Sequence, residues 1–180
     1  MGKHLVLIGG GHAHMVTLAQ MDTIVAQGHT VTVVGPSEHH YYSGMGPGML
    51  GGTYTPDDIR FATRHVVEKQ GGRFIQDKVT AIDAENRSLQ LATGVRLSYD
   101  VLSVNAGSYV PWDLVSGGRD KIYSVKPIEK LMAARQDLMA AMRTRTLKIV
   151  IAGGGPSAAE IGGNIWQLAQ AGGMRPPQIT

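Results

Sequence analysis

The sequence predicts an α/β protein with a Rossmann-like domain, made of a parallel sheet and a small antiparallel β-meander, followed by the start of a second Rossmann-like domain. Three observations support this. A strand, a glycine triplet and a helical pattern follow one another near the N-terminus, the same order returns near the C-terminus, and short strand-like segments lie between them. The first domain is expected at residues 1–142, with the meander at about residues 79–97, and the incomplete second domain at residues 143–180.

The first glycine triplet lies in residues 4–19, HLVLIGGGHAHMVTLA. Residues 5–8 are all apolar, which is typical of a strand buried on both faces of a parallel sheet. After the glycines, apolar residues recur at helical spacing until Gly28, a residue type that commonly ends helices. Because the first N–H groups of such a helix lack internal partners and its dipole is positive there, the turn is suited to a pyrophosphate.

The glycines of this turn have separate expected tasks. Gly9 permits the tight turn, and Gly11 lets phosphates approach the backbone because it has no Cβ atom. His14 stands where the usual fingerprint has a third glycine, whose task is close packing of helix and strand. By itself, the motif is therefore also compatible with a plain strand-to-helix turn.

A second copy of the pattern lies in residues 147–165, where a buried strand leads to Gly153, Gly154 and Gly155 and then to a helix. The wide spacing of the two copies indicates one nucleotide-binding unit followed by the opening of another, rather than a short-period repeat. An acidic residue that would hold the ribose of the second nucleotide is expected on or beyond the strand that begins near Thr180.

The second predicted strand of the first domain, residues 30–34, completes a βαβ unit. An acidic side chain that binds a nucleotide ribose is expected at its end, but the chain continues with Gly35, Pro36 and Ser37 before Glu38. Two interpretations stay open. Either Glu38 reaches back to the ribose or Ser37 takes a weaker polar role, or Glu38 is only a solvated loop residue.

Residues 39–54, HHYYSGMGPGMLGGTY, combine aromatic, methionine and glycine residues with almost no charge. Such a composition suits a pocket for a flat, mostly apolar ring system. Neither histidine pair, His39 with His40 or His12 with His14, has a carboxylate or a third ligand at useful spacing, so no metal site is predicted.

The rest of the first domain is expected as a helix, several short strands and another helix. Residues 55–58, TPDD, carry helix-start chemistry, and this helix should run to about Gln70. Short segments with turn residues then predict the meander and a parallel strand at residues 101–105. A helix over residues 127–142 has methionines suited to a core, and the polar residues 143–146 mark the domain boundary.

Composition narrows the function classes. The 17 basic and 14 acidic residues are spread along the chain without a basic block, so no nucleic-acid partner is predicted. The chain has no cysteine, which excludes disulfides, thiolate metal sites and dithiol redox centres within it. Neither a signal sequence nor an apolar run of transmembrane length is evident, so a cytoplasmic protein is expected.

Three segments together resemble one family: GGGHAH at residues 9–14, YSGMGPGML at residues 42–50 and YDVLSVNAGS at residues 99–108. They are similar to flavoproteins with two dinucleotide-binding domains, the pyridine nucleotide-disulfide oxidoreductase superfamily. Within it, the chain looks most like cysteine-free members. These are the relatives of type II NADH:quinone dehydrogenases and the flavoprotein module joined to selenide, water dikinase.

The resemblance implies FAD in the first domain and NAD(P)H in the second. The implied FAD contacts are Gly9, Gly10, Gly11, His12 and Ala13 for the pyrophosphate, Ser37 and Glu38 for the adenosine ribose, the main chain of Val79 for adenine, Tyr42, Ser43, Met45 and Pro47 for the isoalloxazine, and Ala106 and Gly107 as a second flavin-side motif. Asn105 departs from the common Ala-Thr-Gly form of that motif. The implied NAD(P)H contacts are Gly153, Gly155 and Glu160. Lys126 is either a positive charge that favours the reduced flavin anion or a surface lysine.

The resemblance also implies an FAD-dependent NAD(P)H oxidoreductase, in which hydride passes to the flavin and electrons go on to a quinone or another acceptor. The disulfide-reductase and persulfide branches need a thiolate, which a chain without cysteine does not provide. Two alternatives stay open: a non-catalytic FAD or nucleotide-binding module that works with a partner, and a transferase such as a methyltransferase. An N-terminal portion that is inactive alone, a homo-oligomer, and peripheral membrane attachment of the intact protein are all compatible with the sequence.

Overall fold

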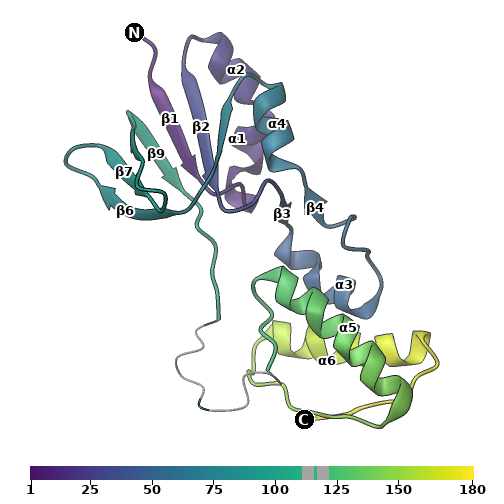
Figure 1. The fold of residues 1–180 in the computed structure, drawn as a ribbon. Coiled ribbons are helices and arrows are strands. Elements are labelled where there is room, and N and C mark those ends of the chain that lie inside the picture. Colours follow the sequence, from purple (N-terminus) through teal and green to yellow (C-terminus); the bar gives the residue numbers. More distant parts are fainter. Residues whose placement is uncertain (111–115, 117–121) are drawn as a thin grey trace. The chain divides into compact units, whose positions relative to one another are not determined.

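The computed structural model describes residues 1–110, 116 and 122–180, which divide into two compact units (Figure 1). The first unit contains residues 1–40 and 61–107, and the second contains residues 41–60 and 108–180. Each unit is therefore built from two separate stretches of the chain. The domain boundary expected at residues 143–146 falls inside the second unit and stays a prediction.

Four parallel strands form the sheet of the first unit, in the order β5-β2-β1-β9. They are β1 (His4–Ile8), β2 (Thr30–Gly35), β5 (Arg73–Gln76) and β9 (Val101–Val104). In this register Leu7 of β1 lies beside Val33 of β2 and Ser103 of β9. The sheet confirms the predicted Rossmann-like parallel arrangement.

One face of the sheet is covered by three short helices (Figure 1). They are α1 (Met15–Ala19), α2 (Met21–Ala26) and α4 (Thr63–Lys69). On this face Leu7 and Val33 pack with Leu18, Met21 and Val67 of the helices. Alternate strand residues point to opposite faces, so the neighbours of Leu7 in β1 serve the other face.

The other face of the sheet packs against the antiparallel meander, which confirms the predicted one. Its strands are β6 (Val79–Asp83), β7 (Ser88–Leu91) and β8 (Arg96–Ser98). Val6 and Val34 of the sheet share a buried cluster with Leu89 and Leu91 of β7. β1 is therefore buried on both faces, as its uninterrupted apolar run predicted.

The helix expected after the glycine triplet is interrupted. It consists of the short 3-10 helix η1 (His12–His14), then α1 and α2, which are separated at Gln20. The side chain of Gln70 lies at the break: its Nε2 donates to the Leu18 carbonyl at 2.7 Å, and the Asp22 N–H donates to its Oε1 at 3.4 Å. An inserted side chain thus replaces the regular bond between Leu18 and Asp22, and such insertions bend or break helices.

The helix expected from residue 55 starts later, so its predicted start is wrong. The capping chemistry is present, since the N–H and Oγ1 of Thr55 both donate to Asp58 Oδ2 at 2.7 Å, and the Asp58 N–H donates back to Thr55 Oγ1 at 3.2 Å. These bonds close a single turn only. The chain then extends through β4 (Arg60–Phe61) before α4 begins at Thr63.

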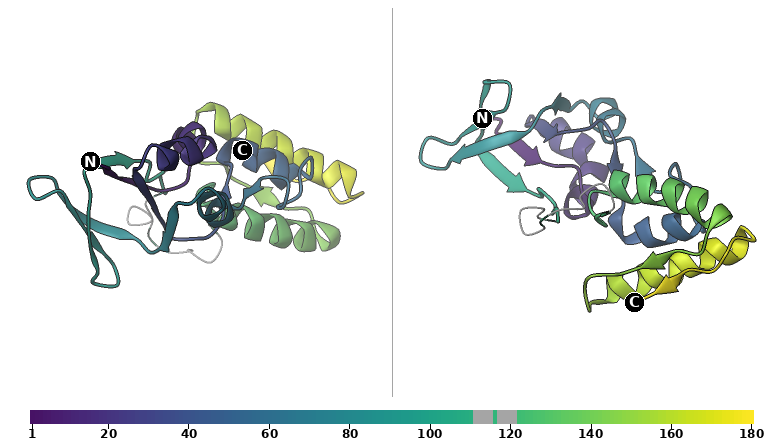
Figure 2. Two further views of the ribbon diagram at one scale, coloured as in Figure 1. Left: turned by 90° about the horizontal axis from the view of Figure 1, so that it is seen from above. Right: turned by 60° about the horizontal axis from the view of Figure 1, so that its bottom comes forward.

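The second unit packs three helices side by side (Figure 2). They are α3 (Gly46–Gly51), α5 (Ile128–Thr144) and α6 (Pro156–Ala171). Met49 and Leu50 of α3 share a buried cluster with Leu131 of α5 and Ile165 of α6. Met142 of α5 is fully buried, in agreement with the core role expected of its methionines.

The remaining elements of the chain are short. They are β3 (His40–Tyr41), η2 (Ser43–Met45), β10 (Lys148–Ile149) and β11 (Gln178–Ile179). β10 pairs in parallel with β11, so the second unit has the strand, glycine triplet, helix and strand expected of a Rossmann-like start. Among the described helices, none is both long enough and apolar enough to cross a membrane.

Candidate functional site

The first glycine triplet connects β1 to η1, which contains the predicted pyrophosphate residues His12 and Ala13. Gly9 has φ of +83°, in the left-handed region that favours glycine, and its N–H donates to the Val34 carbonyl at 2.7 Å. A Cβ atom on Gly9 would lie only 2.2 Å from the main-chain oxygen of Asn105. The turn therefore has no room for a side chain at this position.

The other two glycines are packed almost as closely. A Cβ atom on Gly10 would lie 2.5 Å from Cγ2 of Thr63, the first residue of α4. One on Gly11 would lie 2.7 Å from Nδ2 of Asn105, which directly follows β9. Within the first unit, the loop is thus enclosed between the start of α4 and the end of β9.

His14 stands in place of the third fingerprint glycine and is only 3% exposed. Its Nδ1 lies 2.6 Å from the Gly9 carbonyl oxygen and must be the donor, because a carbonyl only accepts. In the neutral ring, Nε2 then accepts from the Ser103 hydroxyl, whose Oγ is 2.9 Å away. The imidazole therefore ties the glycine loop to β9, a task that a third glycine would not perform.

Several hydrogen-bond donors at this loop have no acceptor among the residues that the structure describes. The N–H of Gly9 donates to the Val34 carbonyl at 2.7 Å, and the N–H of His14 donates to the Gly11 carbonyl at 2.9 Å. Among the residues that the structure describes, no backbone acceptor pairs with the N–H of Gly10 or Gly11. Within the described part of the chain, the buried Nδ2 of Asn105 also has no hydrogen-bond partner. Unpaired donors in an enclosed place favour an anion. The residues therefore fit a pyrophosphate.

Asn105 is absent from the residues that the sequence implies for FAD binding. One sequence signal points to it, because a polar amide at the carboxyl end of a parallel strand lies where such sheets bind ligands. Its small neighbours, Ala106 and Gly107, were implied as a flavin-side motif; both are exposed, and Gly107 has φ of +73°. Their contact with a flavin stays a prediction.

The predicted ribose residues after β2 have protein partners. Oε1 of Glu38 lies 3.1 Å from Nε of Arg64 in an ion pair, and the Arg64 guanidinium stands 5.2 Å from the centroid of the Phe74 ring. Oγ of Ser37 accepts a hydrogen bond from the N–H of His39 at 3.2 Å. An acidic group is thus present near the strand end, but a cation already pairs with it. Its contact with a ribose stays a prediction.

The other residues implied for FAD are divided between the units. Val79 is the half-buried first residue of β6, in the first unit. The second unit contains the other five: Tyr42, Ser43, Met45, Pro47 and Lys126. Ser43 and Met45 are the ends of η2, and Pro47 lies in the first turn of α3. The N–H of Tyr42 donates to the Ile59 carbonyl at 2.9 Å, and Nζ of Lys126 donates to Ser108 Oγ at 3.2 Å. Their roles toward a flavin stay predictions.

The second glycine triplet precedes α6 in the second unit. Gly153 has φ of +143°, and Gly155 is the N-cap of α6 with extended backbone. A Cβ atom on either residue would have no described atom within 4 Å. Glu160 lies one turn into α6, where its carbonyl accepts a hydrogen bond from Asn164 Nδ2 at 2.8 Å. The second loop is therefore open where the first is enclosed.

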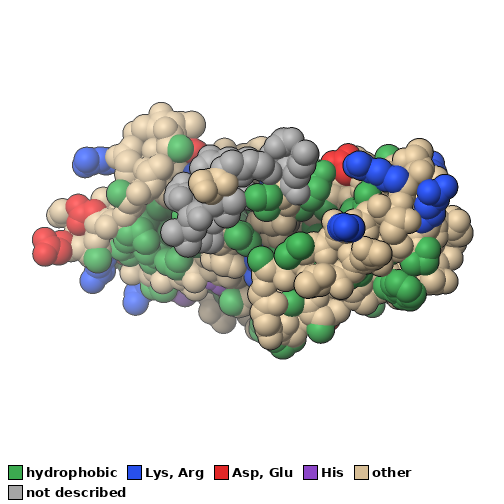
Figure 3. All heavy atoms as spheres, turned by 90° about the horizontal axis from the view of Figure 1, so that it is seen from below, with side chains coloured by type: hydrophobic (Ala, Val, Ile, Leu, Met, Phe, Trp, Pro, Cys, Tyr) green, Lys and Arg blue, Asp and Glu red, His purple; other side chains and the backbone are tan. Residues whose placement is uncertain are grey.

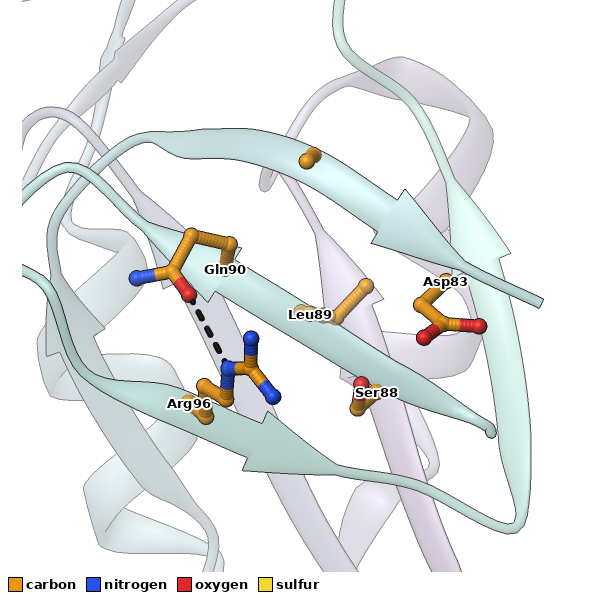
Figure 4. Close-up of a pocket in the computed structure, with 6 residues that line it drawn as sticks. Asp83, Ser88, Leu89, Gln90 and Arg96 are labelled. Carbon is orange, nitrogen blue, oxygen red and sulfur yellow. Dashed lines mark hydrogen bonds between the residues drawn. The ribbon is translucent and has the colours of Figure 1, made fainter. Parts of the chain in front are cut away.

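A depression lies on the antiparallel meander (Figure 4). It is lined by Ala81, Asp83, Ser88, Leu89, Gln90 and Arg96. Nε of Arg96 donates to Oε1 of Gln90 at 3.3 Å, so two of its polar groups satisfy each other. None of these residues was expected to bind a nucleotide, and the glycine loop remains the better candidate site.

The sequence profile of the family described as pyridine nucleotide-disulphide oxidoreductase matches residues 3–172. The chain is 26% identical over 118 residues to the mitochondrial sulfide:quinone oxidoreductase of Dictyostelium discoideum, an alignment that covers 66% of this chain and 26% of that protein. It is 24% identical over 135 residues to the type II NADH:quinone oxidoreductase of Staphylococcus aureus, with 74% of this chain and 33% of that protein covered.

The fold is similar to that of NDH2 from Plasmodium falciparum, solved in complex with NADH, with a TM-score of 0.71 at 18% identity. That likeness covers 94% of this chain and 38% of the other. The chain thus spans about a quarter to a third of the length of the two curated relatives.

Proposed function

This chain belongs to the pyridine nucleotide-disulphide oxidoreductase family, and on that premise we propose that it binds FAD on its first glycine loop and serves hydride transfer from NAD(P)H. The family consists of enzymes that bind FAD and use NAD(P)H. Because the chain spans only part of the length of its relatives, the activity of the whole protein is part of this proposal.

The observation that carries the proposal is the enclosed loop in which two backbone donors have no backbone acceptor among the described residues. The N–H groups of Gly10 and Gly11 take no part in the loop's own hydrogen bonds. An N–H that neither water nor protein reaches costs free energy, and a phosphate oxygen would remove that cost. A plain strand-to-helix turn gives no reason for close packing around three successive glycines.

Each part of the loop has a role in holding the cofactor. Gly9 supplies the left-handed turn, Gly10 and Gly11 supply N–H donors for phosphate, and His14 fixes the loop shape through the Gly9 carbonyl. Bound FAD supplies the redox chemistry, while the protein binds and orients it. The dense packing around the loop keeps these donors in place before the cofactor arrives, which lowers the ordering cost of binding.

The second glycine loop is the proposed NAD(P)H site. Gly153, Gly155 and Glu160 match the fingerprint expected for that nucleotide, and the open space at both glycines is compatible with close approach of a phosphate. Loop, α6 and the pair β10–β11 form only the opening of a dinucleotide-binding domain.

A quinone is the proposed electron acceptor, because both curated relatives compared above are quinone oxidoreductases by name. None of the 180 residues is a cysteine, so no thiolate of this chain relays electrons. The proposed partners are thus small molecules, namely nucleotides and an electron acceptor. We also propose a cytoplasmic location.

The direct test is the absorption spectrum of the purified chain, before and after supply of excess FAD. A flavin spectrum, with FAD released on heating, is expected. NADH-driven bleaching of that spectrum would support hydride transfer, whereas flavin that binds tightly without bleaching would favour the non-catalytic module. Folded, colourless protein that takes up no FAD would exclude both.

The Gly11→Val variant ties flavin binding to the loop. Its side chain would enter the space now held by the Asn105 amide, so FAD occupancy should be lost. Circular dichroism of the FAD-free variant checks that it has folded. Normal flavin occupancy in the folded variant would contradict the assignment of the loop.

A further inference from the structure

One polar group at the glycine loop is left without a protein partner. Nδ2 of Asn105 is buried, and no other group of the described chain accepts its protons. The main chain of this residue is firmly placed, because its N–H donates to the Ile8 carbonyl at 2.8 Å. The backbone therefore holds the amide beside the loop, so the lack of a hydrogen-bond acceptor for Nδ2 does not come from a misplaced main chain.

The neighbouring polar side chain of β9 is fully used. Ser103 lies two residues before Asn105, on the same side of the extended chain, and its hydroxyl bonds to the ring of His14. His14 in turn bonds to the Gly9 carbonyl. The end of β9 thus holds the loop through Ser103, while the Asn105 amide keeps a donor that no described residue pairs with.

The free donor lies against Gly11, where phosphate is expected to approach the backbone closely. A Cβ atom on Gly11 would come within 2.7 Å of Asn105 Nδ2, and its next nearest contacts, at 3.3 and 3.4 Å, would be Cγ and Oδ1 of the same side chain. A buried donor that has no acceptor costs about 1–3 kcal/mol. Retaining such a group makes physical sense if a ligand supplies the acceptor.

We propose that Asn105 Nδ2 donates a hydrogen bond to a pyrophosphate oxygen of bound FAD, as a side-chain donor beside the backbone donors of the loop. This inference rests on the proposed function, since it takes FAD to be the ligand. It assigns a positioning role to the residue at which this chain departs from the Ala-Thr-Gly form. An alanine at this place would offer the loop no side-chain donor.

The Asn105→Leu variant tests the inference, because leucine has nearly the same size but no donor. Its dissociation constant for FAD, measured from quenching of flavin fluorescence, should rise about tenfold to a hundredfold, the range for hydrogen bonds to charged groups. The FAD-free variant should unfold at the same urea concentration as the parent chain or a higher one. If the amide had only a structural role, its replacement by leucine would instead lower the urea midpoint and leave the affinity for FAD unchanged.

The Asn105→Asp variant separates hydrogen bonding from shape. Its carboxylate would face the phosphates, so FAD should bind more weakly than to Asn105→Leu at 0.05 M salt, and the gap should narrow at 0.5 M because salt screens the repulsion. An Asp variant that binds FAD as tightly as the Leu variant at low salt would overturn the proposal.

The matched control is Asn86→Leu in the turn between β6 and β7. There the amide has a partner, since Nδ2 of Asn86 donates to Asp83 Oδ2 at 2.8 Å. This variant should bind FAD normally and lose some stability, the reverse of the pattern expected for Asn105. If the parent chain itself binds no FAD, the proposed function fails; if it binds FAD and the Asn105 variants bind equally well, only the present inference fails.

Discussion

Gly9 and Gly28 have almost the same backbone angle, with φ of +83° and +85°, but different surroundings. A Cβ atom on Gly28 would meet nothing within 4 Å, whereas one on Gly9 would overlap the main-chain oxygen of Asn105. We expect Gly28→Ala to lower the free energy of unfolding by only the left-handed strain, about 1–2 kcal/mol. Gly9→Ala should lose clearly more, because the loop or β9 must move. Urea unfolding measures both, and equal losses would contradict the close approach.

The bridge from Gly9 through His14 to Ser103 predicts coupling between the two side chains. His14→Ala removes both hydrogen bonds of a buried ring and leaves a cavity, so we expect a loss of about 2 kcal/mol or more. Ser103→Ala removes one of the same bonds. In a double-mutant cycle the two losses should fall short of additivity by about 0.5–3 kcal/mol. Additive losses in urea unfolding would mean that the bond contributes nothing.

At the residue scale the sequence predicts the loop but not what surrounds it. Three consecutive glycines after an apolar strand are a local signal, so Gly9 to Gly11 could be located without a structure. Asn105 and Thr63 are far away in the sequence, and only the folded sheet brings them to the loop. The bridging role of His14 was hidden for the same reason, because its partner Ser103 lies on another strand.

Helices and strands could likewise be predicted where their causes are local, but not where they depend on residues far away in the sequence. The uninterrupted apolar run of β1 and the apolar alternation of β2 and β7 could be predicted, because each pattern lies within its own segment. The break at Gln20 could not, because it depends on Gln70 reaching the Leu18 carbonyl from α4. In the TPDD segment the local signal is present but the predicted helix is not. Thr55 and Asp58 make their capping hydrogen bonds, yet the chain extends into β4 immediately afterwards.

The turns of the meander predict how stability depends on pH. Hydrogen bonds from the side chain of Thr93 and the N–H of Lys78 lower the pKa of Asp77 below its ordinary value of 3.8, and bonds from Asn86 lower the pKa of Asp83. A lowered folded-state pKa stabilises the fold above the unfolded-state value, and the effect is lost as the pH falls through the lower one. The urea midpoint should therefore be steady from pH 7 to about pH 5 and fall below about pH 4.

The variants Asp77→Asn and Asp83→Asn should each make that acid fall shallower. Glu85→Gln, in the turn between β6 and β7, removes a negative charge from the same hairpin and serves as the control for net charge. An unchanged acid slope in both Asp variants would show that these turn bonds do not contribute.

At the scale of the whole molecule, the 17 basic and 14 acidic residues are spread along the chain. On the face drawn in Figure 3, the described Lys and Arg side chains do not gather into one patch, and Asp and Glu side chains lie near some of them. The two compact units could not be read from the sequence, because residues 41–60 join residues 108–180 through contacts between distant parts of the chain, and no local pattern encodes such contacts.

The two glycine loops belong to different units, so their ligands should be separable by mutation. Gly155 has extended backbone and open space, and Gly155→Val should fold normally and still bind FAD. FAD at about 100 times its dissociation constant should then stabilise this variant and the parent chain equally, by about 2.7 kcal/mol, whereas Gly11→Val should gain nothing. Thermal unfolding with and without FAD measures each shift. Loss of the FAD shift in Gly155→Val would contradict the assignment, because it would place the flavin on the second loop or make both loops one site.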